Sequence, residues 1–101
     1  MKRAILMNKR DTVATALGNL QADEVVNVVL ASQESFKQIT VKQTVPSGHK
    51  LAVRPMARGR EVVKYGEVIG QASRDIDLGD YVHIHNVKSN RMQLPEIWYR
   101  K

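Results

Sequence analysis

The sequence contains no cysteine, and aromatic residues make up only 5% of its 101 residues. Without cysteine there is no disulfide framework, no thiolate zinc site and no cysteine nucleophile. So few aromatic side chains argue against a stacking platform for single-stranded nucleic acid. The apolar run at residues 4–7 is too short for a signal peptide, and no stretch is long enough to span a membrane. We therefore expect no membrane association and a cytoplasmic location.

The chain carries a formal net charge of +6, with its basic residues spread along the sequence and not gathered in one run. Such a charge suits an anionic substrate or an acidic partner, and a nucleic acid ranks third behind them. The length predicts a single domain over residues 1–101, which buries roughly 65% of its unfolded surface around one modest core.

The pattern of apolar residues predicts a mostly β domain of the α+β class with one helix near the N-terminus. Asp11 is a suitable N-cap for a helix over residues 12–20. The apolar residues at helical spacing in this segment are Val13, Ala16, Leu17 and Leu20. Residues 2–7 and 24–31 are expected to be strands, the second of them buried on both faces. A half-exposed strand over 37–45 is expected to pair with it as a hairpin.

Two histidines lie in an alternating segment near the C-terminal end of the chain. On a strand over residues 80–86, Val82 and Ile84 would face the core, and His83 and His85 would face away from it. The two imidazoles would then lie about 7 Å apart. Imidazoles at this spacing can bind a metal, move a proton or hold an anion, although a metal site needs a further ligand. The alternative is a pair of half-exposed strand residues without chemistry.

Three turn or loop segments separate the remaining strands. Residues 46–50 form a loop through Pro46 and Gly48, residues 54–60 carry three arginines, and residues 77–80 form a turn. The first loop ends on His49 and Lys50, which are either solvated side chains or binding groups. An apolar tail over 91–101 is expected to cover the core or to meet another subunit.

Three blocks, residues 46–52, 59–72 and 79–86, resemble in order and spacing the N-terminal domain of altronate and galactarate dehydratases. They are also similar to the small subunit of sulfolactate sulfo-lyase. The resemblance covers residues 11–90 and implies an SAF domain with a β-clip fold. Ser47 departs from the family pattern, in which a phenylalanine or similar residue is expected. The dehydratases continue into a long catalytic region, so this chain is expected to be the free-standing small subunit or a domain of a longer enzyme.

The resemblance implies a lyase that removes water or sulfite from an α-hydroxy acid or sugar acid through an enediolate-like intermediate. Such a reaction needs a base for the α-proton, positive charge at the carboxylate and an acid for the leaving group. It also implies a divalent metal, with iron as the candidate, held mainly by a larger catalytic subunit. The sequence leaves open a homo-oligomer.

The matching blocks predict the site residues. His83 and His85 are the candidate catalytic residues and metal ligands. The candidate substrate-binding residues are His49, Lys50, Lys64, Tyr65 and Asn86. We expect the His49–Lys50 pair to lie beside the Lys64–Tyr65 pair in one positively charged recess. The alternative function is a non-catalytic SAF module that binds a sugar acid or a protein partner, because a fold alone does not fix an activity.

Overall fold

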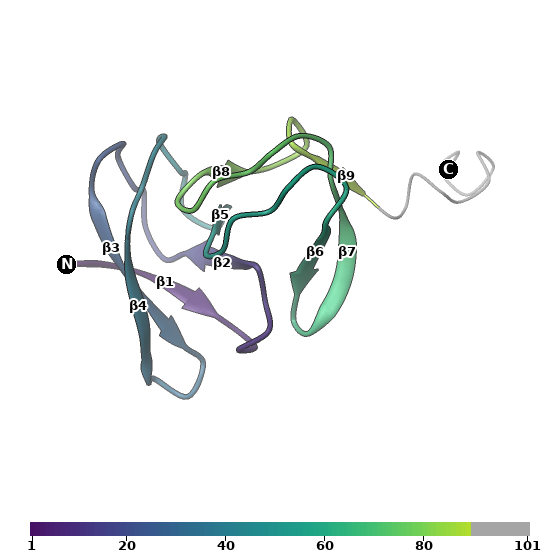
Figure 1. The fold of residues 1–101 in the computed structure, drawn as a ribbon. Coiled ribbons are helices and arrows are strands. Elements are labelled where there is room, and N and C mark those ends of the chain that lie inside the picture. Colours follow the sequence, from purple (N-terminus) through teal and green to yellow (C-terminus); the bar gives the residue numbers. More distant parts are fainter. Residues whose placement is uncertain (90–101) are drawn as a thin grey trace, which may run out of the picture.

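Nine short strands build the part of the chain that the computed structural model describes, residues 1–89 (Figure 1). Six of them form one sheet in the order β4-β3-β1-β2-β5-β8. Their bounds are β1 Lys2–Leu6, β2 Val13–Ala16, β3 Val25–Leu30, β4 Ser35–Thr40, β5 Lys50–Ala52 and β8 Tyr81–Val82. β1 and β3 are parallel, and every other pair in this sheet is antiparallel.

The smaller sheet has the order β6-β7-β9, with β6 at Glu61–Lys64, β7 at Glu67–Ala72 and β9 at Val87–Ser89. Figure 1 shows the β6–β7 hairpin standing beside the larger sheet. Its two-residue loop, Tyr65-Gly66, has positive φ at both positions, +57° and +74°. This is the conformation of a type I′ hairpin turn, which suits glycine and strains a tyrosine.

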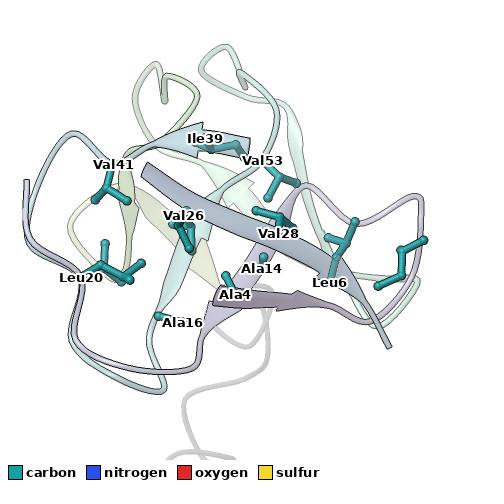
Figure 2. Packing of buried hydrophobic residues seen from close by; sticks show 13 residues of the cluster. Ala4, Leu6, Ala14, Ala16, Leu20, Val26, Val28, Ile39, Val41 and Val53 are labelled. Atoms are coloured by element: carbon teal, nitrogen blue, oxygen red, sulfur yellow. The ribbon is translucent and has the colours of Figure 1, made fainter. Parts of the chain in front are cut away.

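Two hydrophobic clusters hold the sheets together. The larger one gathers side chains from β1, β2, β3, β4 and β5 and from the segments beside them, which provide Leu20, Val41 and Val53 (Figure 2). The smaller one lies under the β6–β7 hairpin and includes Val62, Ala72 and Ile76. β2 and β5 serve both clusters, because neighbouring residues on a strand point to opposite faces. Thus Ala14 and Leu51 belong to the larger cluster, and Val13 and Ala52 belong to the smaller one.

Four turns of the described residues, at 21–24, 46–49, 57–60 and 77–80, combine one hydrogen bond with a positive φ at the third residue alone. In each turn the last N–H donates to the first carbonyl. The third residue has positive φ, as a type II turn requires: Asp23, Gly48, Gly59 and Gly79. A buried apolar residue precedes each turn: Leu20, Val45, Met56 and Ile76.

The four turns form two pairs, one pair in each hydrophobic cluster. Each turn of a pair bonds to a residue that lies shortly before the other turn. The turn at 46–49 bonds the N–H and carbonyl of Ala16, and the turn at 21–24 bonds those of Val41. The turn at 77–80 bonds the N–H and carbonyl of Ala52, and the turn at 57–60 bonds those of Ala72. Each bonded residue lies four positions before the apolar residue of its own turn, so the chain repeats one nine-residue unit four times, at 16–24, 41–49, 52–60 and 72–80.

The predicted helix over 12–20 is wrong. Residues 13–16 form β2, Leu17 is 55% exposed, and Leu20 forms an isolated bridge to Val45. The helical spacing arose by coincidence, because a strand shared by two cores is apolar at adjacent positions. The described residues are therefore all-β, and they contain no helix that could cross a membrane.

The other predicted strands are present, but their bounds and burial differ from the prediction. β3 and β4 form the expected hairpin, but β3 is buried on one face, with Val25 44% exposed. β4 ends at Thr40, and the chain beyond it enters the paired turns. The expected tail over 91–101 lies outside the described residues.

Candidate functional site

The three histidines of the sequence meet around one tyrosine, Tyr81 of β8. The Tyr81 hydroxyl lies 2.6 Å from Nδ1 of His49. Its ring stacks on His83 with a centroid separation of 5.6 Å and an interplanar angle of 6°. His85 is tilted against the same ring at 5.6 Å, and the His49 and His83 rings are 5.3 Å apart. We call Tyr81 and these three histidines the imidazole cluster.

The strand that was predicted to carry both histidines ends early. β8 stops at Val82, and a turn follows, in which the N–H groups of Asn86 and Val87 both donate to the His83 carbonyl. Val82 is buried as expected, but Ile84 is 83% exposed, so the prediction that Ile84 faces the core is wrong. The turn breaks the alternation and still leaves His83 half-exposed and His85 exposed.

Asn86 holds this turn in place. Its side chain is 4% exposed, accepts a hydrogen bond from the His83 N–H at 2.9 Å and donates one to the Tyr81 carbonyl at 2.8 Å. Gln43 fixes the other backbone group of Tyr81 by accepting from its N–H at 2.8 Å. Asn86 was predicted to bind substrate, whereas both polar atoms of its amide serve the loop that carries His83 and His85.

Lys50 and Lys64 add positive charge beside the cluster. Burial lowers the pKa of Lys50, and the nearby Lys64 ammonium lowers the pKa of Lys50 further. Lys64 lies over the Tyr65 ring, with Nζ 4.9 Å from its centroid. Neither lysine forms an ion pair with the residues that the structure describes, where the ion pairs are Lys2–Glu24 and Lys42–Asp77.

Asp11 positions the hairpin tip that carries Lys64 and Tyr65. The Asp11 carboxylate is 1% exposed and accepts hydrogen bonds from the N–H groups of Tyr65, at 3.0 Å, and Gly66, at 2.8 Å. These bonds support the strained Tyr65 backbone. Asp11 therefore acts as a clamp between the β1–β2 connection and the hairpin, and not as the predicted helix cap.

An open groove of about 230 Å³ lies beside Lys50 and the loop after β8, and His49, Lys64 and Tyr65 are not among its lining residues. Lys50 and His83 line it together with apolar side chains from the smaller sheet and the loop, and the full lining is Lys50, Ile69, His83, Ile84, Val87 and Ser89. A larger hollow of about 640 Å³ has Arg54 on its wall, but Arg54 is bonded to the carbonyls of Lys9 and Asp11. Arg60 also lines the larger hollow, but no histidine does, so the smaller groove is the one of the two that combines a cation with an imidazole.

The described residues do not form a metal site by themselves. Within residues 1–89, no group of three or more histidine, cysteine, aspartate or glutamate side chains is arranged to hold a metal ion. His83 and His85 are thus two donors at most, and a divalent metal needs more. We derive no chemical step through a metal bound by this chain alone.

Sequence reasoning missed Tyr81, Asp11 and Gln43 as parts of this site. Tyr81 stood in a matching block and on the same predicted face as His83, which was a usable signal. Asp11 and Gln43 act over separations of 54 and 38 residues, to Tyr65 and Tyr81. No local pattern encodes contacts of that range.

Comparison with known protein families shows which family the chain resembles. The family model for the altronate/galactarate dehydratase SAF domain matches residues 2–90. The chain belongs to this SAF domain family. Membership confirms the predicted resemblance and extends it to the first strand, β1.

Curated relatives of this SAF domain include two kinds of protein. Altronate dehydratase of Bacillus subtilis is 38% identical over 89% of this chain and 17% of its own length. The Escherichia coli enzyme is 36% identical over 95% of this chain and 18% of its own. The (2R)-sulfolactate sulfo-lyase subunit alpha of Paracoccus pantotrophus is 40% identical over 62% of this chain and 94% of its own length. This chain thus spans less than a fifth of the dehydratases and nearly all of that alpha subunit.

Proposed function

We propose that this SAF domain is the small subunit or domain of a lyase that acts on an α-hydroxy acid or sugar acid together with a larger catalytic chain. The observation that carries the proposal is a pair of lysines, Lys50 and Lys64, without a carboxylate partner among residues 1–89, beside an imidazole cluster. Two close ammonium groups that lack a counter-charge suit a carboxylate ligand. Kinship with altronate dehydratase and the sulfo-lyase alpha subunit gives the reaction class.

The residues divide the chemistry as follows. Elimination removes the proton on the carbon beside the carboxylate, and the electron pair of that bond forms the new double bond as the hydroxyl or sulfite leaves. Lys50 and Lys64 bind the carboxylate and stabilise the negative charge that develops on it. His83 and His85 exchange protons with the substrate or its leaving group. His49 and Tyr65 complete the anion site, and Asn86 holds the loop.

The larger chain supplies what the SAF domain lacks. No aspartate or glutamate lines the groove, so a metal shell built on carboxylates has to come from the partner. A divalent metal there, with iron as the candidate, would polarise the substrate carboxylate and hydroxyl. The cytoplasm is the compartment we propose for this enzyme.

Affinity capture from the native cell extract, followed by calorimetry, tests the proposal. We expect the chain to retain a larger lyase chain, and the complex to bind altronate, galactarate or sulfolactate. Lys50→Ala and Lys64→Ala should each weaken that binding by about 1–3 kcal/mol, the range for a lost charged hydrogen bond. Lys42→Ala is the matched control, because Lys42 pairs with Asp77 away from the groove. A chain that stays alone in the extract would refute the proposal.

A second function, a binding module without turnover, is favoured by the lack of acidic residues around the groove. Such a module would bind the sugar acid tightly and leave the turnover of any partner unchanged. Calorimetry combined with the partner's turnover separates the two functions. Filter binding at low salt tests the third-ranked ligand, nucleic acid, whose affinity would rise as salt falls.

A further inference from the structure

Tyr81 contacts every imidazole of the sequence, although no prediction assigned it a role. It is bonded to His49, stacked on His83 and packed against His85. Its backbone is held at both polar groups, by Gln43 and Asn86, and its ring also packs on the larger hydrophobic cluster. A tyrosine fixed in this way can impose an orientation on side chains that would otherwise rotate.

The bond between Tyr81 and His49 has a preferred direction. A phenol, with an ordinary pKa near 10, is a far stronger acid than the N–H of a neutral imidazole. The hydroxyl therefore donates, and Nδ1 of neutral His49 accepts. The proton of the ring then resides on Nε2. Among the described residues Nε2 has no hydrogen-bond partner, and no unpartnered side-chain nitrogen is buried, so this N–H is open to solvent.

We propose that Tyr81 is a positioning residue that locks neutral His49 in the Nε2–H tautomer. In this form His49 donates a hydrogen bond and has no free lone pair to act as a base. Proton transfer is left to His83 and His85, which lack such a bond to the Tyr81 hydroxyl. The consequence for anion binding rests on the proposed function, because the donor is useful only if an anionic ligand enters beside Lys50.

Nitrogen NMR of the imidazoles in the 101-residue chain tests the tautomer without any partner. At a pH where imidazoles are neutral, we expect one tautomer of His49, with Nδ1 accepting a hydrogen bond. Tyr81→Phe keeps the ring and removes the hydroxyl, so the minor Nδ1–H form should appear. Tyr65→Phe is the matched control and should leave the His49 signals unchanged. A natural chain with the proton on Nδ1, or a Tyr81→Phe spectrum identical to it, would overturn the proposal.

Substitution of His49 in the assembled enzyme tests the donor role. A glutamine keeps a donor N–H at the place of Nε2 and cannot take up a proton. We expect His49→Gln to stay within about tenfold of the natural turnover and His49→Ala to fall about a hundredfold, as for loss of one charge-stabilising donor. Equal loss in both variants would assign His49 as a base and overturn the donor role. If no lyase chain is found, the proposed function fails, while the NMR result still decides the Tyr81–His49 bond.

Discussion

Lys50 illustrates how position changes the chemistry of a single residue. The side chain is half-buried, faces the Lys64 ammonium and lacks an ion-pair partner among the described residues, so its charged form is disfavoured. An anionic ligand would reverse that effect, because a negative charge favours the ammonium. Binding of the acid should therefore return the pKa of Lys50 towards its ordinary value.

Replacing the second lysine tests this coupling. Lys64→Gln should raise the pKa of Lys50, since the repulsion disappears and the burial remains, and NMR titration of the Lys50 side chain measures it. In the pH range between the lowered pKa of folded Lys50 and the ordinary value of 10.5, the unfolded chain binds more protons than the folded chain. In this range Lys50 therefore makes the free energy of unfolding rise with pH. Lys64→Gln should narrow this pH range, because it brings the pKa of folded Lys50 closer to the ordinary value. Lys42→Gln is the control, and an unchanged pKa of Lys50 in Lys64→Gln would show that the two ammonium groups do not interact.

Asp11 is the residue on which the hairpin tip depends most. Asp11→Ala would leave the N–H groups of Tyr65 and Gly66 without their acceptor and release the strained loop. We expect a loss of about 3 kcal/mol in the free energy of unfolding, near the upper end for unsatisfied buried groups. Denaturant titration measures it, with the exposed Glu67→Ala as control. A loss below about 0.5 kcal/mol would mean that the carboxylate does not hold the tip.

At the scale of elements, the paired turns organise the fold more than the strands do. Each pair joins two segments that are 20 to 25 residues apart. In each segment, one residue is bonded through both its N–H and its carbonyl to the turn of the other segment. The turn at 46–49 delivers His49 and Lys50 to β5, and the turn at 77–80 delivers Tyr81 to β8. These two strands are adjacent in the sheet, which explains how His49 meets Tyr81.

The glycines of these turns provide a graded test. A Cβ on Gly79 would lie 2.2 Å from the Thr40 carbonyl oxygen, and φ is +88°, so Gly79→Ala should cost about 3 kcal/mol or more. Gly48 has φ +83° and open space around it, so Gly48→Ala should cost about 1–2 kcal/mol. Gly18→Ala, with neither constraint, should change stability by less than about 0.5 kcal/mol. Thermal unfolding ranks the three variants, and equal losses would contradict the role given to the turns.

The sequence predicted the elements that depend on local patterns. The β3–β4 hairpin and the turn at 77–80 follow from alternation and from turn residues. The false helix over 12–20 arose because Val13 and Ala14 are buried in different clusters, which a one-faced pattern cannot express. The nine-residue unit was present in the sequence as an apolar residue, a second apolar residue four positions later, and glycine or aspartate three positions after that. Its meaning depends on pairing between distant units, so it became visible only in the fold.

For the candidate site, the sequence predicted which residues lie together better than how they are arranged. His49, Lys50 and His83 do lie close together, because the blocks that contain them form neighbouring elements. Ile84 is exposed where alternation placed it in the core, because Asn86 turns the chain directly after β8. The metal predicted at His83 and His85 remains a prediction for the assembled enzyme.

At the scale of the whole molecule, the groove lies open beside an exposed apolar side chain on the loop that follows β8. Ile84 is 83% exposed and lines the groove with Lys50 and His83. If the larger chain closes this groove, Ile84→Ser should weaken association with it by about 1–3 kcal/mol, since burial of an isoleucine contributes that much. Leu17→Ser, also exposed and not part of the groove lining, is the control for folding and solubility. Surface plasmon resonance measures the affinity of each variant for the larger chain. Equal affinities of the two variants would place the interface elsewhere.

The central claim is that this SAF domain takes part in the lyase reaction of a larger chain. The direct measurement is turnover of altronate, galactarate and sulfolactate by the larger chain, with and without this chain, and with a Lys50→Ala, Lys64→Ala double variant. The account predicts turnover of one of these acids only when both chains are present, and loss of most of it with the double variant. The same turnover in the presence and absence of this chain would contradict the account.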